Sequence, residues 1–295
     1  MPAASVVRVQ FRNQMTNTIG TATQDEGPGS SEPIRDARHP IQSHSTDDVR
    51  RYYDEKTAAY VEGFGEVFQG SRPESTEHLL DYLLDSARIS DGMRILDAGC
   101  GVCGPAIYFA EHREITIDAL TISPVQVREA ERRVTSKGLA DRITVREGDF
   151  HRLAEMYPPN TFDRILFLET ICHASDYRKV LEQARMVLKP DGYLYIKDFY
   201  CVDFRSMPDL IDAQKEDLKA LNRVYRLVLP DLASIVDLLS ELGFSLKYLR
   251  ELRYEPFSAP WEKFEQLAGI TWTPKLRDVI ASMEILCMKP FDRSR

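Results

Sequence analysis

The sequence of 295 residues predicts an α/β protein with a seven-stranded, mostly parallel sheet and helices on both of its faces. The main observation is that strand-like apolar runs alternate with amphipathic helical patterns from about residue 75 onward. A second observation is the glycine-rich stretch "ILDAGCGVCG" at 95–104, which joins the first strand to the next helix. In such sheets a ligand binds at the edge where the parallel strands end.

The expected strands are short runs rich in β-branched and aromatic residues, such as "ITIDALTI", and turn residues bound them. They cover 93–98, 115–122, 142–147, 162–168, 192–199, 244–250 and 283–288. Helical spacing of apolar residues predicts helices at 75–88, 103–112, 124–137, 176–188 and 231–242. The stretch "KPDG" predicts the turn into the fifth strand. Right-handed crossovers bring the loops after parallel strands to one edge, so we expect the ligand site in 97–104, 121–126, 148–150 and 169–173.

Segments outside this regular alternation are expected to form a tail, a flap and two lids. Residues 1–45 are polar and rich in Gly, Pro and Ser, which predicts a disordered N-terminal tail. Residues 46–74 carry an aromatic stripe at helical spacing and are expected to form a helical flap over the site. The main domain then covers 75–295, with 200–230 and 254–274 as lid segments that contact a bound molecule.

Composition and charge exclude several classes of protein. The formal net charge is −8 at pH 7, so we expect no nucleic-acid partner. No apolar run is long enough for a membrane span and no secretory leader is recognisable, so we expect a cytoplasmic protein. The five cysteines are odd in number, and Cys100 and Cys103 lack a second pair, so we expect buried thiols and no metal site. The composition leaves a homo-oligomer open.

A carboxylate, Asp97, directly precedes the loop glycines Gly99 and Gly101. It would repel a pyrophosphate, because two unit charges ~4 Å apart interact by about 4 kcal/mol at an effective dielectric constant near 20. A cationic ligand is attracted instead, and S-adenosyl-L-methionine, with its sulfonium and ammonium groups, fits the loop. Three alternatives stay open: a helix-capping Asp97, a glycine turn without a ligand, and a nicotinamide enzyme with Asp118 on the ribose. Asp118 lies early in its strand, which places it away from the crevice.

Several motifs resemble one enzyme family. "ILDAGCGVCG" resembles the first motif of class I S-adenosylmethionine-dependent methyltransferases, with Cys103 where the family has glycine. "LTISPVQ" and "EGDF" resemble the second and third loops of tocopherol methyltransferases and cyclopropane synthases. "FLETICHASD" and "RYYDEKTAAYVEGFGEVF" resemble segments of sterol 24-C-methyltransferases. The resemblance covers about 50–200 and implies a Rossmann-like class I methyltransferase fold and a C-methyltransferase of the sterol, geranyl-diphosphate and prenyl-chain kind.

The resemblance also implies cofactor contacts. Thr121 and Gln126 are expected to contact the ribose, where many class I enzymes use an acid. Asp149 is expected to accept from the adenine amino group, and Phe150 to lie near the ring. Tyr53 is expected near the methionine end. For Asp149 and Phe150 the alternatives are a turn acid and a core aromatic residue.

The predicted function is methylation of a carbon–carbon double bond in an apolar prenyl, terpenoid or sterol-like molecule of secondary metabolism. Attack by an alkene leaves a carbocation, which aromatic faces stabilise and one carboxylate can deprotonate. We expect Glu169 to be that base and His173 to assist it, although His173 as a positioning or core residue is an equal alternative. Eight aromatic residues are candidates, of which we expect three or four to face the acceptor: Tyr52, Tyr53, Phe64, Phe199, Tyr200, Tyr225, Phe257 and Trp261.

Other functions of the same sequence stay open. A small-molecule O- or N-methyltransferase would use Glu169 or His173 as its base on a hydroxyl or amine. A non-catalytic module would bind the nucleotide and use 200–274 for partners. A diphosphate on the acceptor would need a basic cluster, although solvated surface charges are the favoured reading of the six candidates, Arg50, Arg51, Lys197, Arg205, Arg223 and Arg226.

Overall fold

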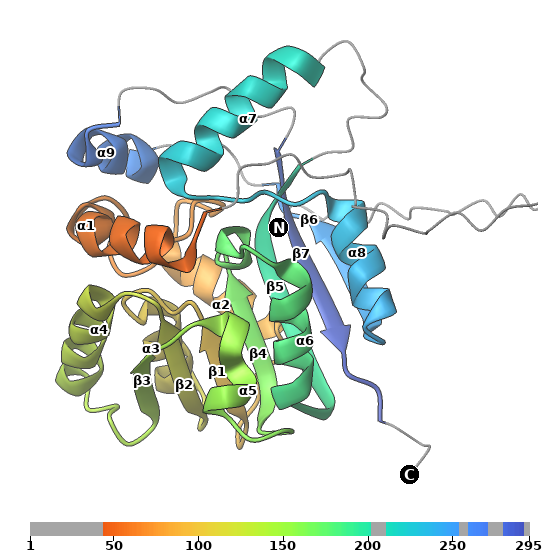
Figure 1. Ribbon diagram of the computed structural model, residues 1–295. Coiled ribbons are helices and arrows are strands. Elements are labelled where there is room, and N and C mark those ends of the chain that lie inside the picture. The colour runs from red at the N-terminus through yellow and green to blue at the C-terminus, as the bar shows by residue number, and fades with distance from the viewer. Residues whose placement is uncertain (1–43, 202–210, 254–258, 271–279, 292–295) are drawn as a thin grey trace, which may run out of the picture. The chain divides into compact units, whose positions relative to one another are not determined.

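The described part of the molecule is built around one mixed β-sheet (Figure 1). The structure, a computed structural model, describes residues 44–201, 211–253, 259–270 and 280–291. Within these residues the strands are β1 (Arg94–Ala98), β2 (Thr116–Thr121), β3 (Ile143–Glu147), β4 (Phe162–Leu168), β5 (Leu188–Cys201), β6 (Ser245–Glu251) and β7 (Ile280–Met288). Their order is β3-β2-β1-β4-β5-β7-β6. β1 to β5 pair in parallel and β7 is antiparallel to β5 and β6, so the predicted seven-stranded, mostly parallel sheet is confirmed.

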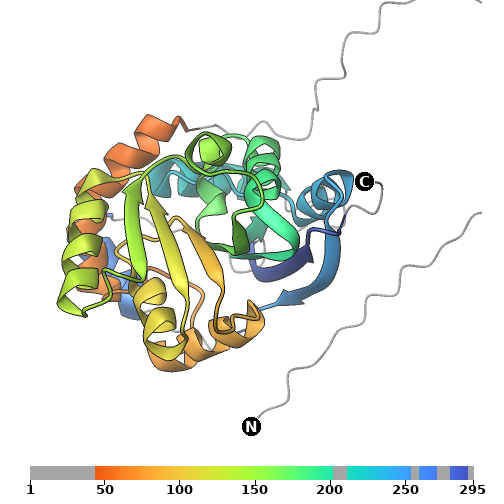
Figure 2. The same ribbon diagram turned by 90° about the horizontal axis from the view of Figure 1, so that it is seen from below.

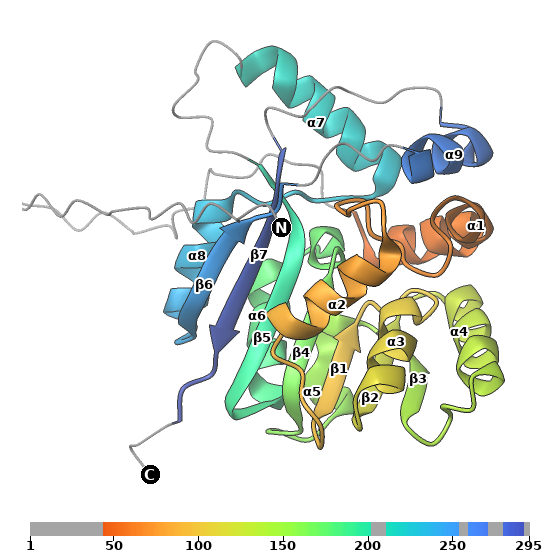
Figure 3. The ribbon, with the colours of Figure 1, turned by 180° about the vertical axis from the view of Figure 1, so that it is seen from behind.

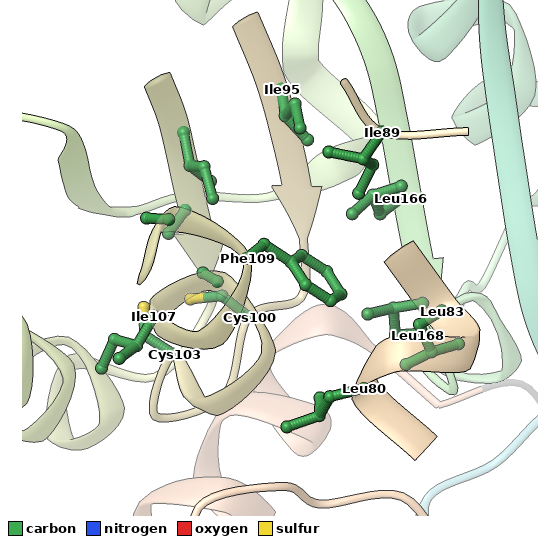
Figure 4. Packing of buried hydrophobic residues seen from close by; sticks show 14 of the residues in the cluster. Leu80, Leu83, Ile89, Ile95, Cys100, Cys103, Ile107, Phe109, Leu166 and Leu168 are labelled. Carbon is green, nitrogen blue, oxygen red and sulfur yellow. The ribbon is translucent and has the colours of Figure 1, made fainter. Parts of the chain in front are cut away.

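Helices cover both faces of the sheet (Figure 2). On one face lie α2 (Thr76–Ser86), α3 (Gly104–His112) and α4 (Pro124–Ser136), and on the other α5 (Leu153–Met156), α6 (Tyr177–Val187) and α8 (Leu232–Glu241). Neighbouring strand residues alternate between the two cores: Ile95 packs in the first and Leu96 in the second. Figure 4 shows Phe109 of α3 extending toward Leu83 of α2. These two cores fix the edge at which the parallel strands end.

Three further helices lie together at that edge of the sheet, as Figures 1 and 3 show. They are α1 (Thr46–Phe64), α7 (Ile211–Tyr225) and α9 (Ala259–Ala268). α1 begins with a capping box, in which Ser45 and Asp48 exchange hydrogen bonds between side chain and backbone. The three helices share a cluster of buried aromatic side chains, Tyr52, Tyr60, Phe64, Tyr225 and Phe264. This cluster joins segments that are about 200 residues apart in the chain.

The structure corrects several predicted boundaries. β5 begins at Leu188 and not at 192, because "KPDG" bulges out within the pairing of β4 and β5 while Asp191 keeps the positive φ of a turn, 59°. The short helices α5, η1 (Phe150–Arg152) and η2 (Ile171–His173) were not predicted, since three or four residues show no helical period. α9 occupies a segment that the sequence marked only as a lid.

Some predicted segments fall outside the described residues. These are 1–43 of the expected tail, and 202–210, 254–258 and 271–274 of the two expected lids, with Arg205 and Phe257 among them. Of the first lid segment, α7 is described, and of the second, α9. Within the described ranges, no helix is both long enough and apolar enough to cross a membrane.

Candidate functional site

A cleft lies at the carboxyl edge of the parallel strands, and we call it the strand-edge cleft. It encloses about 870 Å³ together with its open mouth. Its walls are the loops after β1, β2, β3 and β4, together with α1 and the loop that follows α1. All ten predicted site residues line it: Tyr53, Asp97, Gly99, Gly101, Thr121, Gln126, Asp149, Phe150, Glu169 and His173. The four segments that the sequence assigned to one edge therefore do come together.

The loop after β1 depends on backbone conformations that glycine favours. Gly99 has φ 106° and Gly101 has φ 53°, both in the left-handed region. A Cβ on Gly99 would lie 2.6 Å from the Cβ of Thr170, and one on Gly101 would lie 3.3 Å from the ring of Phe68. Cys103 also has a positive φ, 65°, a conformation that glycine adopts more readily than other residues. The loop thus leaves room for a ligand against its backbone.

Asp97 has an unusual environment at the bottom of the strand-edge cleft. Its side chain is 2% exposed, and its Oδ2 has no hydrogen-bond partner. Burial raises the pKa of this carboxyl group to about 7. Asp97 does not cap α3, because Cys103 is the N-cap residue of that helix. A cation that enters the cleft would supply the partner that Oδ2 lacks.

The loop after β2 presents hydroxyl and amide groups to the cleft. The Thr121 hydroxyl donates to Gln126 Oε1 at 2.5 Å, and both side chains are buried. Ser123 caps α4 through the backbone N–H of Gln126 and donates to Asp54 of α1 at 2.6 Å. Asp118 sits in mid-strand, paired with two arginines, and does not line the cleft. The alternative of a nicotinamide enzyme with Asp118 on the ribose therefore loses its support.

The loop after β3 contains an acid and an imidazole in contact. Asp149 Oδ1 lies 2.6 Å from His151 Nδ1 and accepts from the His151 backbone N–H at 2.9 Å. Desolvation raises the pKa of Asp149, but the hydrogen bonds from His151 outweigh it and lower the pKa overall. Phe150 packs edge-on against Phe167, with ring centroids 5.8 Å apart. His151 lines the cleft and was not among the predicted site residues, although it stands two residues after Asp149.

A second cleft adjoins the first, and we call it the aromatic cleft. It encloses about 1550 Å³ including open solvent, between α1, α7, α9 and the end of β5. Five of the predicted aromatic residues line it: Tyr53, Phe64, Phe199, Tyr225 and Trp261. Tyr60 and Phe68 line it as well and were missed. Among the described residues, no lysine or arginine lines the aromatic cleft, whereas three glutamates do, Glu169, Glu262 and Glu265.

Two predicted aromatic residues are placed elsewhere. Tyr52 of α1 is buried in the aromatic cluster that α1 shares with α7 and α9, where its hydroxyl lies 3.0 Å from that of Tyr60. Tyr200 is buried in the core on the α6 and α8 face, and its hydroxyl has no partner. Helical or strand periodicity places both residues on the inner face of their element, which does not distinguish a core position from a cleft position.

Four residues line both clefts: Tyr53, Phe68, Glu169 and His173. Of these, Glu169 is the most constrained. Its carboxylate accepts from the backbone N–H groups of Gly70 at 2.6 Å and Ser71 at 3.0 Å, and it forms a buried ion pair with Lys197. Glu169 also has a left-handed φ of 58°. Its side chain therefore ties the loop after α1 to the end of β4.

Tyr53 and His173 form a hydrogen-bonded pair on the same shared wall. His173 Nδ1 lies 2.8 Å from the carbonyl oxygen of Arg226, so this nitrogen must donate. Nε2 is then the acceptor, and the Tyr53 hydroxyl donates to it at 2.8 Å. Burial lowers the pKa of His173 to about 4, which keeps the ring neutral near pH 7.

The other arginines and cysteines that the sequence singled out form no second site within the part of the chain that the structure describes. Arg50 and Arg51 pair with acids on the exposed face of α1, as expected of solvated charges. Arg223 and Arg226 line neither cleft. All five cysteines are free and buried, and within the described residues no cluster of His, Cys, Asp and Glu could hold a metal ion.

Comparisons with known proteins agree with this geometry. Residues 89–254 match the family described as "Methyltransferase domain". A sterol 24-C-methyltransferase of Gibberella zeae is 31% identical over 55% of this chain, which spans only 44% of that relative's length. The 27-O-demethylrifamycin SV methyltransferase of Amycolatopsis mediterranei is 30% identical, over 72% of this chain and 71% of its own.

Among solved structures, geranyl diphosphate C-methyltransferase of Streptomyces coelicolor, in complex with Mg²⁺, geranyl diphosphate and S-adenosyl-L-homocysteine, superposes with a TM-score of 0.64. The superposition covers 83% of this chain and 98% of that one at 14% identity, which speaks for the fold alone. The fold, the glycine loop and the residues matched by the family all indicate the same kind of protein. The chain therefore belongs to the methyltransferase domain family, in its class I, S-adenosylmethionine-dependent group.

Proposed function

We propose that this methyltransferase transfers a methyl group from S-adenosyl-L-methionine to a carbon–carbon double bond of an apolar prenyl, terpenoid or sterol-like molecule. The observation that carries the proposal is the aromatic cleft, which adjoins the strand-edge cleft across Glu169 and has no cationic side chain among its described lining residues. The sterol 24-C-methyltransferase among the relatives supports the same reaction class.

The strand-edge cleft fits the cofactor. The unpartnered Oδ2 of Asp97 matches the ammonium group, and the left-handed backbone of Gly99 and Gly101 allows a close approach. Thr121 and Gln126 offer a hydroxyl and an amide to the ribose, and Asp149 offers a carboxylate to the adenine amino group. Each of these groups lines the cleft already, without rearrangement of the loops.

The aromatic cleft suits an apolar acceptor that becomes cationic during the reaction. Rings of Tyr60, Phe64, Tyr225 and Trp261 surround it, and aromatic faces stabilise a cation by about 0.5–2 kcal/mol each. A diphosphate would meet three glutamates and, among the described residues, no lysine or arginine. The acceptor proposed here is therefore uncharged at its binding site, unlike geranyl diphosphate.

S-adenosyl-L-methionine supplies an electrophilic methyl group when bound, and the alkene that receives it becomes a carbocation. The carboxylate of Glu169, which forms a buried ion pair with Lys197, provides a negative charge on the wall that the two clefts share. We propose that Glu169 then takes the proton from the carbon next to the cation, and that the C–H electron pair forms the new double bond. Three donors hold this carboxylate and fix its position.

Closure of the site is part of the proposal. Residues 46–74 form a flap, since α1 and the loop after it line both clefts, and α7 and α9 form the lid of the aromatic cleft. A carbocation reacts with water, so a cleft that is closed to water protects the cation until it is deprotonated.

The alternative of O- or N-methylation has one observation in its favour. The neutral Tyr53–His173 pair faces both clefts and could receive a proton from an acceptor hydroxyl through Tyr53. The 27-O-demethylrifamycin SV methyltransferase supports it too. A pKa of about 4 makes His173 a weak base, however, which favours the alkene acceptor.

The test is product analysis with labelled S-adenosyl-L-methionine and matched acceptors. Each prenylated small molecule is paired with its saturated analogue, and products are analysed by mass spectrometry and NMR. Label on carbon in the unsaturated member only is the expected result. Label on oxygen or nitrogen in both members would replace the alkene acceptor with the alternative.

Glu169→Gln alone cannot test the base, because it leaves the buried ammonium of Lys197 without its partner. The double variant Glu169→Gln/Lys197→Met removes both charges, and Glu155→Gln on the surface of α5 serves as the control. We expect the double variant to bind S-adenosyl-L-homocysteine and to lose about 10²–10⁴-fold in turnover. A double variant that makes the normal product at the normal rate would exclude Glu169 as the base.

A further inference from the structure

Gln69 is a buried amide for which the protein provides no hydrogen-bond partner. It lies in the loop between α1 and α2, is 2% exposed, and lines the strand-edge cleft. Neither its Nε2 nor its Oε1 has a partner. A buried amide without partners destabilises a folded protein, and an apolar side chain of similar size would not carry this cost. An amide in this state indicates a missing ligand group or a bound water.

The loop that carries Gln69 is fixed on both sides of the residue. Before it, the ring of Phe68 lies against Gly101 in the loop after β1. After it, the backbone N–H of Gly70 donates to Glu169 at the end of β4. Gln69 is therefore held between residues that contact the loops after β1 and β4, two neighbouring strands of the sheet.

The charges of the cleft show which part of the ligand this amide meets. No lysine or arginine is among the described residues that line the strand-edge cleft, so a ligand carboxylate must be bound by neutral donors. Thr121 and Asp149 belong to the β2 and β3 side, where the ribose and adenine are assigned. Asp97 and Gln69 belong to the β1 and β4 side, and their orphaned atoms complement an ammonium and a carboxylate group.

We propose that Gln69 recognises the amino-acid end of S-adenosyl-L-methionine, with Nε2 donating to the ligand carboxylate while Asp97 accepts from the ammonium. The sequence offered no signal for this residue, since "FQGSR" belongs to none of the recognised motifs. The inference rests on the cofactor of the proposed function and is independent of the acceptor. It assigns the loop after α1 a direct part in cofactor selection.

The experiment compares two ligands that differ only at this end. S-adenosyl-L-homocysteine has the amino-acid group, and 5′-methylthioadenosine lacks it. Their Kd values are measured by titration calorimetry for the wild type, for Gln69→Leu and Gln69→Glu, and for Gln266→Leu on the exposed surface of α9 as the matched control. Melting of each ligand-free protein is recorded in parallel.

We expect Gln69→Leu to weaken the binding of S-adenosyl-L-homocysteine about 10- to 100-fold, which is the range for a hydrogen bond to a charged group. The Kd of 5′-methylthioadenosine should stay within twofold of the wild-type value. Gln69→Glu should weaken the binding of S-adenosyl-L-homocysteine further by repelling the carboxylate. The ligand-free Tm of Gln69→Leu should not fall, because the variant removes two unpartnered buried atoms.

Two outcomes would overturn the inference. Equal weakening of both ligands would mean that Gln69 shapes the whole cleft rather than its amino-acid end. Unchanged affinity for S-adenosyl-L-homocysteine together with a lower Tm would mean that the amide binds a structural water. Failure of the wild type to bind S-adenosyl-L-homocysteine would instead contradict the proposed function itself, so the two failures are distinguishable.

Discussion

The strand-edge cleft and the aromatic cleft share a wall but are built in different ways. The first is formed mainly by loops that follow parallel strands, together with α1 and the loop after it, and hydroxyl, amide and carboxylate groups line it. The second is formed by α1, α7 and α9, and aromatic rings line most of it. Backbone pairing in the sheet positions the loops after β1 to β4, whereas aromatic packing and a few side-chain hydrogen bonds and ion pairs join the helices of the second cleft. None of the described residues that line the strand-edge cleft belongs to α7 or α9, so we expect substitutions on these two helices to leave that cleft intact.

The largest expected effect is a loss of stability at the wall that both clefts share. Lys197→Met leaves the carboxylate of Glu169 buried without its cation, which should cost about 3–5 kcal/mol of unfolding free energy. Urea denaturation measures the loss. The control is Lys219→Met, whose exposed pair with Glu216 should contribute less than about 1 kcal/mol. Equal stability of the two variants would show that the shared wall is not held by this ion pair.

The next effect is confined to the strand-edge cleft. Gly101→Val places a side chain against Phe68 at a φ of 53°, so we expect at least a ~100-fold loss of S-adenosyl-L-homocysteine affinity. Gly138→Val is the matched control, because Gly138 also has a positive φ, 69°, but no atom lies within 4 Å of its added Cβ. The control should lose stability and keep the affinity. Titration calorimetry separates the two effects.

Asp97→Asn should lower the affinity for S-adenosyl-L-homocysteine about tenfold, because it removes charge complementarity with little change in shape. The wild type should also bind more weakly as the pH falls below 7, since the pKa of Asp97 is about 7 and the protonated acid no longer attracts the ammonium. The asparagine variant should lose this pH dependence. Parallel binding curves from pH 5.5 to 8 would contradict the assignment.

The raised pKa of Asp97 also predicts how the stability of the ligand-free protein depends on pH. It is raised above the ordinary value of 3.8, so the protonated carboxyl group stabilises the fold below about pH 4, and this contribution is lost as the pH rises through 7. Burial also raises the pKa of Asp198 to about 7, so the wild type carries both contributions. The difference between wild type and Asp97→Asn in thermal melts from pH 4 to 8 isolates that of Asp97.

The smallest effect belongs to the aromatic cleft. Tyr225→Phe removes the hydroxyl that donates to Glu265 and should cost about 0.5–1.5 kcal/mol of stability. Affinity for S-adenosyl-L-homocysteine should stay within twofold of the wild type. Tyr108→Phe, which removes an exposed hydrogen bond to Asp81, is the control for the loss of a hydroxyl. A large fall in cofactor affinity for Tyr225→Phe would show that the two clefts are not separable.

Much of the strand-edge cleft could be predicted because its residues follow strands in the sequence. "ILDAGCGVCG" places Asp97, Gly99 and Gly101 in one turn, and parallel pairing brings Thr121 and Asp149 to the same edge. Local spacing and sheet topology are sufficient for such a site. The roles of these residues in binding and catalysis stay predictions.

The aromatic cleft could be predicted only in part, because it joins Tyr60, Tyr225 and Trp261 from three distant helices. Apolar periodicity shows that a side chain turns inward, and it does not show which neighbours it meets. The ion pair of Glu169 and Lys197 had an unused signal. A lysine within the apolar strand "YLYIKDF" is expected to pair with a buried acid, and Glu169 directly follows the neighbouring strand β4. The hydrogen bonds from the backbone N–H groups of Gly70 and Ser71 to Glu169 had no such signal, since every residue type except proline carries this donor.

The position of α1 has a consequence for how the two ligands bind. This helix places Val49 and Tyr53 in the strand-edge cleft, and Tyr53, Tyr60 and Phe64 in the aromatic cleft. A shift of α1 that is favoured by one ligand is therefore felt at the site of the other. Thermodynamic linkage then requires reciprocity: the factor by which the cofactor tightens the acceptor equals the factor by which the acceptor tightens the cofactor. We therefore expect α1, together with the other residues that line both clefts, to couple the binding of donor and acceptor.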